Sequence, residues 1–181
     1  MTSLMQTLGL TGTAMATVAV VGAGFDMAQH RIPNWLTVGG LVLGLALRAP
    51  LGWSGLGAGL AGAGVCLLLS LPLFLVGGAG GGDVKFLTAL GAFLGLDRVP
   101  EALFVMAMVG GLMAVVAIVR RGSIAELTAN FRTIFSTFGK KTFTGWKGED
   151  SEAALTIDSP GAVTVPYGVA IAAGALAGWF L

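Results

Sequence analysis

Six runs of apolar residues, separated by short polar stretches, dominate the pattern along the chain. They cover residues 8–25, 35–47, 56–76, 84–96, 102–119 and 162–181. A helix needs roughly 20 apolar residues to cross about 30 Å of hydrocarbon, and four of the runs approach that length. The second and fourth runs have 13 residues each, so we expect them to extend into flanking residues or to be sheltered by their neighbours. The pattern predicts an all-α fold, a polytopic membrane helix bundle of about six transmembrane helices.

The composition agrees with a surface that faces lipid. The mean hydropathy is +0.89, 55% of the residues are hydrophobic and only 10% are charged, whereas a soluble domain carries about a quarter charged residues. The length fits a single integral membrane domain over residues 1–181, with a cytosolic loop at about 120–161. The net charge of +1 gives no reason to expect a nucleic acid or another polyanion as a partner. Membrane lipids are the partner that the composition predicts.

Two further features narrow the class of protein. Cys66 is the only cysteine, which excludes a disulfide within the chain and a CxxC metal or redox site, so we expect a buried apolar filler. Residues 1–7 contain no Lys or Arg, although a signal peptide needs a basic start. We therefore expect the first apolar run to be a retained helix.

The basic residues predict the orientation in the membrane, because cytoplasmic loops carry an excess of Lys and Arg. With the N-terminus outside, the outer loops hold only Arg48 and Arg98. The inner loops then hold Arg31, Lys85, Arg120, Arg121, Arg132, Lys140, Lys141 and Lys147. Eight basic residues in the inner loops against two in the outer loops favour this orientation over the inverted one.

The long polar stretch between the fifth and sixth runs contains two different parts. Residues 124–138 carry apolar side chains at helical spacing with basic residues nearby, which predicts an interfacial amphipathic helix. A helix packed on the inner face of the protein itself is an equal alternative. Residues 145–160 are acidic and rich in turn formers, which predicts a cytosolic loop.

Two aspartates border the apolar runs and are the candidates for chemistry. Asp26 closes the first run and Asp83 opens the fourth, so the predicted orientation places both at the cytosolic boundary. Ionisable side chains near membrane depth are costly and are therefore functional candidates. Two neighbouring carboxylates share a proton, which lets one activate a water while the other polarises a carbonyl. This is aspartyl peptidase chemistry, and it needs no cofactor and no metal.

The glycine run before Asp83 has two interpretations. Without Cβ atoms, residues 80–82 would let a substrate strand approach the backbone and would allow the unusual torsions of a tight turn. Alternatively, the run is only a turn or a close helix contact, and Asp83 is the N-cap of the fourth helix after Gly82. If both aspartates are only caps or anchors, the protein is a membrane scaffold. A small proton- or cation-coupled transporter is another alternative, although we find no inverted repeat.

Three motifs in order carry a family resemblance over most of the chain from residue 20 onward. Gly80-Gly81-Gly82-Asp83 is a GxGD motif, Asp26 is followed by Arg31-Ile32-Pro33-Asn34, and the last run opens with Val165-Pro166-Tyr167-Gly168. This combination resembles the type IV prepilin peptidases, a family of GxGD intramembrane aspartyl peptidases.

The resemblance implies an enzyme of the bacterial inner membrane that removes a short basic leader from prepilins at the cytosolic face. Its catalytic pair would be Asp26 and Asp83. His30, the sole histidine, borders the site as a possible tuning residue or an ordinary interfacial one, and Lys85 is either a site residue or a positive-inside anchor. The candidate substrate and loop residues are Gly80, Gly82, Lys85, Pro33, Asn34 and Pro166.

The chain departs from the larger, bifunctional members of that family, which carry an insertion with paired CxxC motifs and also methylate the new N-terminus. It resembles the short form associated with Flp-type, tight-adherence pili. We therefore expect peptidase activity alone, with a bifunctional peptidase and N-methyltransferase as the alternative. The loop at 120–161 is a candidate for gating the substrate or contacting the pilus secretion machinery.

Overall fold

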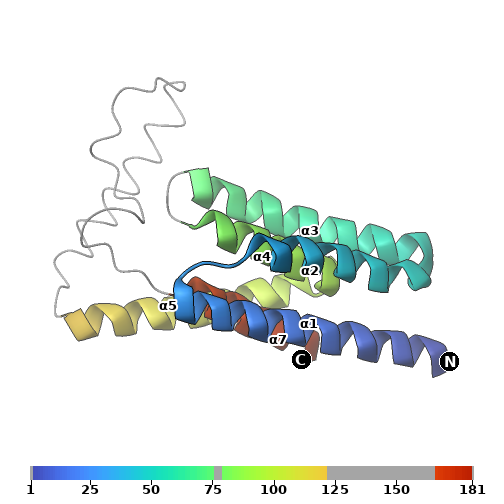
Figure 1. Cartoon of the computed structure of the whole chain (residues 1–181), viewed down its shortest axis with the longest axis horizontal. Coiled ribbons are helices and arrows are strands. Elements are labelled where there is room, and N and C mark those ends of the chain that lie inside the picture. The colour runs from blue at the N-terminus through green and yellow to red at the C-terminus, as the bar shows by residue number, and fades with distance from the viewer. Residues whose placement is uncertain (1, 76–78, 122–165, 181) are drawn as a thin grey trace, which may run out of the picture.

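The computed structural model describes residues 2–75, 79–121 and 166–180, and every regular element in these ranges is helical (Figure 1). The elements are α1 (Thr2–Gln29), α2 (Asn34–Arg48), the 3-10 turn η1 (Ala49–Leu51), α3 (Gly52–Leu75), α4 (Gly81–Leu94), α5 (Val99–Arg121) and α7 (Tyr167–Phe180). Within the described ranges, each of the six apolar runs overlaps one α-helix. The prediction of an all-α helical membrane bundle is confirmed.

Helix α4 lies at the centre of the bundle. It packs against α1, α2, α3 and α7, while α5 packs against α7. In Figure 1, α2 and α3 lie with α4 on one side of the molecule, and α1, α5 and α7 lie on the other. The buried residues of α4 are Val84, Phe86, Leu87, Ala89, Leu90, Gly91, Ala92, Phe93 and Leu94. Neighbouring helices therefore shelter the short fourth apolar run, which is one of the two arrangements expected from its length.

Helix α2 reaches its length differently. It exposes large apolar side chains such as Val38 and Val42, so it is not enclosed. Instead, η1 extends it before Gly52, whose φ of 76° lies in the left-handed region that favours glycine. The chain then returns as α3 beside α2 (Figure 1).

Small residues allow α4 to approach its neighbours closely, as expected for helix interfaces in membranes. A Cβ atom built on Gly91 of α4 would lie 2.7 Å from both the Cys66 Sγ and the Gly62 carbonyl oxygen of α3. On the other side, a Cβ atom on Gly22 of α1 would collide with the ring of Phe86. Cys66 itself is buried in this packing, as predicted.

Three helical stretches are long and apolar enough to cross a membrane, among the described residues. They are Gln6–Gln29, Asn34–Leu75 and Val99–Ala117. The second contains α2, η1 and α3, and α7 is a shorter apolar helix. The count of six spans and the orientation stay predictions. The predicted interfacial helix at 124–138 and loop at 145–160 lie outside the described residues.

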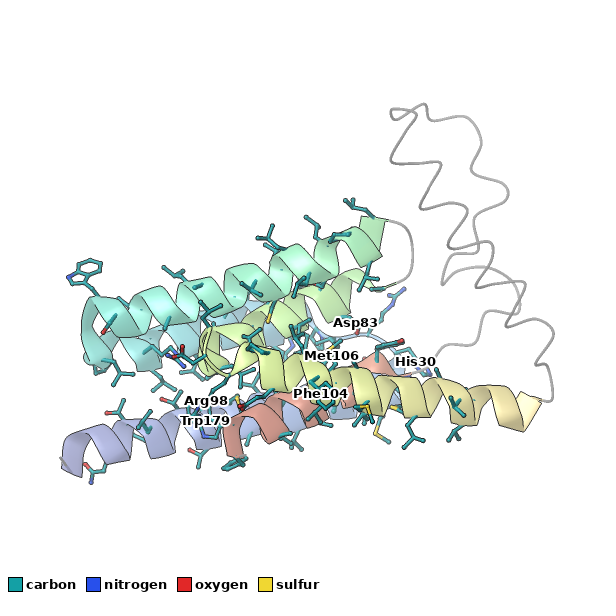
Figure 2. The ribbon with its side chains drawn as sticks, turned by 180° about the vertical axis from the view of Figure 1, so that it is seen from behind. His30, Asp83, Arg98, Phe104, Met106 and Trp179 are labelled. Atoms are coloured by element: carbon teal, nitrogen blue, oxygen red, sulfur yellow. The ribbon has the colours of Figure 1, made fainter. Side chains whose placement is uncertain are left out.

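The helices alternate in direction, which gives the bundle two distinct ends. Helices α1, α3 and α5 end where α2, α4 and α7 begin, and we call this the α4 N-terminal end (Figure 1). The opposite, α4 C-terminal end contains Arg98, whose guanidinium carbon lies 4.2 Å from the centre of the Trp179 ring. Figure 2 shows Asp83 and His30 at the first end and Arg98 and Trp179 at the second.

Candidate active site

Asp26 lies in the last turn of α1 and is buried, with 6% of its surface exposed. Its Oδ2 atom accepts a hydrogen bond of 2.7 Å from the backbone N–H of Gly168. Gly168 is the second residue of α7, and the first N–H groups of a helix have no partner within that helix. A side chain of α1 therefore caps the start of α7.

Only glycine fits at residue 168. A Cβ atom built there would lie 2.8 Å from both the Cβ and the Oδ2 of Asp26. The residue that donates the hydrogen bond thus also lets the α7 backbone come against the carboxylate. Gly168 belongs to the sequence motif at the start of the last apolar run, but it is not among the site residues predicted from the sequence. The motif was the only available signal, because nothing in the sequence tells what residue 168 contacts.

Asp83 lies in the first turn of α4. Its Oδ2 accepts a hydrogen bond of 3.3 Å from the backbone N–H of Gly80, while the Gly80 carbonyl accepts from the N–H groups of Asp83 and Val84. The N-cap is therefore Gly80, and the alternative that Asp83 occupies that position is wrong. Asp83 nevertheless caps the helix from its third position, in one half of a capping box.

The glycines before Asp83 contribute small size rather than unusual torsions. Gly80 is extended with a φ of −75°, and Gly81 and Gly82 already belong to α4. The only glycines with positive φ in the described ranges are Gly52 and Gly95, so residues 80–82 do not use the unusual torsions that glycine would allow. Without side chains, Gly81 lies beside Phe74 and Gly82 beside Ile32.

The two carboxyl groups lie close enough to influence each other electrostatically. Burial of Asp83, together with the nearby charge of Asp26, raises the pKa of Asp83 to about 6, although the Gly80 hydrogen bond acts in the opposite direction. Asp83 lies outside the candidate spans. Burial and a neighbouring like charge both disfavour the ionised form of a carboxyl group. A proton is therefore held on Asp83 at pH values where an isolated aspartate is ionised.

The polar candidates around the pair connect α4 to α2. The Nζ atom of Lys85 donates a hydrogen bond of 3.0 Å to the Oδ1 of Asn34, the first residue of α2. Both side chains are exposed. Pro33 precedes α2, and its carbonyl accepts from the N–H groups of Leu36 and Thr37.

Pro166 and His30 also lie at helix ends. The carbonyl of Pro166 accepts from the N–H of Val169 in the first turn of α7. His30 is exposed, and its N–H donates to the carbonyl of Asp26. With a φ of 49°, His30 takes the left-handed conformation that ends α1. Among the described residues, no group of three or more His, Cys, Asp or Glu is placed to hold a metal ion.

Comparison with known proteins identifies the family. The model of the type IV leader peptidase family matches residues 13–115, which is more than half of the chain and includes both Asp26 and Asp83. Helix α7 and Gly168 lie outside the matched segment. The comparisons with curated proteins and with solved structures returned no match. The matched segment is long enough to decide the question: the chain belongs to the type IV leader peptidase family, and its membership indicates a peptidase.

Proposed function

We propose that this membrane peptidase is an aspartyl endopeptidase whose catalytic pair is Asp26 and Asp83. The observation that carries the proposal is that both carboxyl groups lie at the α4 N-terminal end (Figure 1), where the nearby charge of Asp26 contributes to the raised pKa of Asp83. The two residues are 57 positions apart and belong to different helices, α1 and α4. Two carboxyl groups that only cap separate helices have no need to lie within electrostatic reach of each other. Two carboxyl groups that share a proton must do so.

The pair supports hydrolysis without a cofactor. The ionised member takes a proton from a bound water, whose oxygen attacks the scissile carbonyl carbon, while the protonated member donates its proton to the carbonyl oxygen. The resulting tetrahedral intermediate then breaks the C–N bond. The proton taken from the water passes to the leaving nitrogen, and a proton of the intermediate returns to the second carboxyl group.

Family membership supports a type IV prepilin as the substrate, and we propose removal of a short basic leader. We further propose a Flp-type prepilin and peptidase activity alone, because the 181 residues contain one cysteine and no paired CxxC motifs. The proposed location is the cytosolic face of a bacterial inner membrane. Its support is the charge bias: Arg31 follows the end of α1 and Lys85 lies near the start of α4, both at the α4 N-terminal end, whereas Arg98 lies at the opposite end (Figure 1 and Figure 2).

We propose that the residues flanking the pair contact the substrate. They are Gly80, Gly82, Lys85, Pro33, Asn34 and Pro166. Lys85 and Asn34 are exposed and already form one polar contact next to α4's first turn, which makes them accessible to an incoming peptide. The loop at 120–161 is proposed to meet the secretion machinery.

The test is co-expression with Flp-type prepilins, with leader loss followed by gel shift, N-terminal sequencing and mass spectrometry. Wild type should cut after the leader glycine, and Asp26→Asn and Asp83→Asn should each lose at least ~100-fold in rate while remaining inserted. Asp97→Asn is the matched control, since this exposed aspartate lies in the turn between α4 and α5 at the opposite end.

The outcomes separate the alternatives. If either Asp26→Asn or Asp83→Asn cuts at the wild-type rate, that aspartate is structural and the proposed pair is wrong. A methylated product N-terminus would replace the simple peptidase by the bifunctional enzyme. If wild type leaves all prepilins uncut, the transporter and scaffold alternatives gain support.

A further inference from the structure

The two carboxyl groups of the proposed pair are held by different backbone donors. Asp26 accepts a 2.7 Å hydrogen bond from Gly168, at the start of a neighbouring helix. Asp83 accepts a 3.3 Å hydrogen bond from Gly80, three residues before it in the chain. Asp26 is buried, whereas Asp83 is only partly buried. The pair is therefore asymmetric before any substrate arrives.

Resting on the proposed function, we propose that Asp26 is the general base and Asp83 the general acid, and that Gly168 is the residue that positions Asp26 for this role. The N–H of Gly168 donates to Oδ2 of Asp26, and a hydrogen bond to a carboxylate is stronger than one to a neutral carboxyl group, so this contact favours the ionised form of Asp26. Its length of 2.7 Å lies at the short end of the range for N–H donors, where hydrogen bonds to charged groups are found.

The position of Gly168 strengthens this assignment. Anions are stabilised at the N-terminus of a helix, and α7 has 14 residues. Asp83 also lies in a first helical turn, but its single hydrogen bond is long for an N–H donor. The free proton of the pair therefore belongs on Asp83, in agreement with its raised pKa.

The assignment fixes the path of each proton. Asp26 takes a proton from the water as the new C–O bond forms, and Asp83 gives its proton to the carbonyl oxygen. When the C–N bond breaks, Asp26 passes its proton to the leaving nitrogen, and Asp83 recovers a proton from a hydroxyl of the intermediate. One water is consumed, and both carboxyl groups return to their starting states.

The first test uses the pH dependence of cleavage by purified enzyme in detergent, with a prepilin as substrate. The amide of Asp83→Asn still donates a hydrogen bond at every pH, so we expect a residual kcat at least ~10-fold above that of Asp26→Asn, which has no base. We also expect kcat/KM of wild type to fall at high pH, and this basic limb to be absent in Asp83→Asn.

Other titratable and charged groups at this end would leave a different signature. Those in the described residues are Asp26, His30 and Arg31 at the end of α1, Lys85 on α4, Arg120 and Arg121 at the end of α5, and Tyr167 on α7. If the basic limb persists in Asp83→Asn, it belongs to one of these groups, and the assignment is overturned. A residual rate of Asp26→Asn equal to or above that of Asp83→Asn overturns it as well.

The second test separates positioning from packing with two glycines of α7. A Cβ atom on Gly168 would lie 2.8 Å from Asp26, and one on Gly178 would lie 2.8 Å from the Cβ of Ala102 on α5. We expect Gly168→Ala to lose at least ~100-fold in kcat with KM within about threefold. Gly178→Ala should lower thermal stability while keeping kcat per folded molecule.

Equal losses of kcat in the two variants would mean that Gly168 only packs, which overturns its positioning role. The asparagine variants keep the size of the side chain, so the role assignment stays testable even if Gly168→Ala does not fold. Wild type that cuts no prepilin overturns the proposed function itself, whereas an active wild type with symmetric asparagine variants overturns only the present inference.

Discussion

The two ends of α4 are held in opposite ways. At the C-terminal end, the Nε and one terminal nitrogen of Arg48 donate to the carbonyl of Phe93, at 3.0 and 2.9 Å, and the same terminal nitrogen donates to the carbonyl of Leu94 at 2.6 Å. At the N-terminal end, the one side-chain cap among the described residues is the 3.3 Å hydrogen bond between Asp83 and Gly80. The C-terminal end of α4, which lies away from the carboxyl pair, is therefore held by several strong hydrogen bonds, and we call it the firm end. The N-terminal end, where chemistry is proposed, is held by one weak side-chain hydrogen bond, and we call it the light end.

This difference has a physical reason. A carboxyl group that must gain and lose a proton cannot be committed to several strong donors, because such donors would fix it as a carboxylate. The orphan carbonyls at the other end of α4 have no such constraint, and a cation there both satisfies them and complements the helix dipole. The C-terminal end can therefore carry strong hydrogen bonds that stabilise α4 without fixing the protonation state of Asp83.

The largest expected effect comes from removing the firm anchor. Arg48→Met keeps an apolar side chain of similar length but leaves the carbonyls of Phe93 and Leu94 without their charged donor. Since hydrogen bonds to charged groups contribute about 1.5–3 kcal/mol each, we expect a loss of about 4 kcal/mol in the free energy of unfolding. The measurement is reversible unfolding in mixed micelles. Cleavage per folded molecule should stay within threefold of wild type.

Arg98→Met is the matched control at the same end. Arg98 makes one 3.4 Å contact to the Trp179 carbonyl and a cation–π contact with that ring, so its loss should cost about 1 kcal/mol. If Arg48→Met is no more destabilising than Arg98→Met, the anchoring of α4 by Arg48 is wrong. If Arg48→Met instead abolishes cleavage in folded protein, the contacts at the C-terminal end of α4 also control the carboxyl pair, and the separation of roles between the two ends is wrong.

A smaller effect on the free energy of unfolding is expected from Asp83 at the light end of α4, and this effect depends on pH. Because the pKa of Asp83 is raised from 3.8 to about 6, native protein binds more protons than unfolded protein between these values. The free energy of unfolding therefore falls as pH rises through this range, by about 3 kcal/mol, and is level above it. In Asp83→Asn this fall should be absent. A wild-type profile that rises or stays level between pH 4 and 7 would contradict the raised pKa.

The sequence predicted that both aspartates lie at the same end of the bundle, and the reason is topological. Two helices lie between Asp26 and Asp83 in the sequence. If successive helices cross the bundle in opposite directions, the chain leaves one end after Asp26 and returns to the same end before Asp83. The charge bias of Arg31 and Lys85 supported the same arrangement. Such features depend only on order and periodicity, which a sequence states directly.

What the sequence could not predict depends on contacts between distant segments. Arg48 was counted as one of two outer cations, but it is half-buried against the end of α4, 45 residues away. Gly168 meets Asp26 from 142 residues away. The torsions of residues 80–82 could not be predicted, because a glycine run permits left-handed conformations without requiring them. In each case several packings agree with the same pattern.

The smallest expected effect on stability concerns the exposed contact between α4 and α2, and it tests whether the light end also reads the substrate. Lys85→Met and Asn34→Ala each break the same 3.0 Å hydrogen bond, and each should cost less than about 1 kcal/mol because both side chains are exposed. If Lys85 contacts the prepilin, Lys85→Met should raise KM several-fold in a cleavage assay while kcat changes little. Asn34→Ala, which keeps the ammonium group, should then raise KM less. Equal changes in the two variants would mean that the hydrogen bond shapes the start of α2 and that the charge of Lys85 recognises nothing.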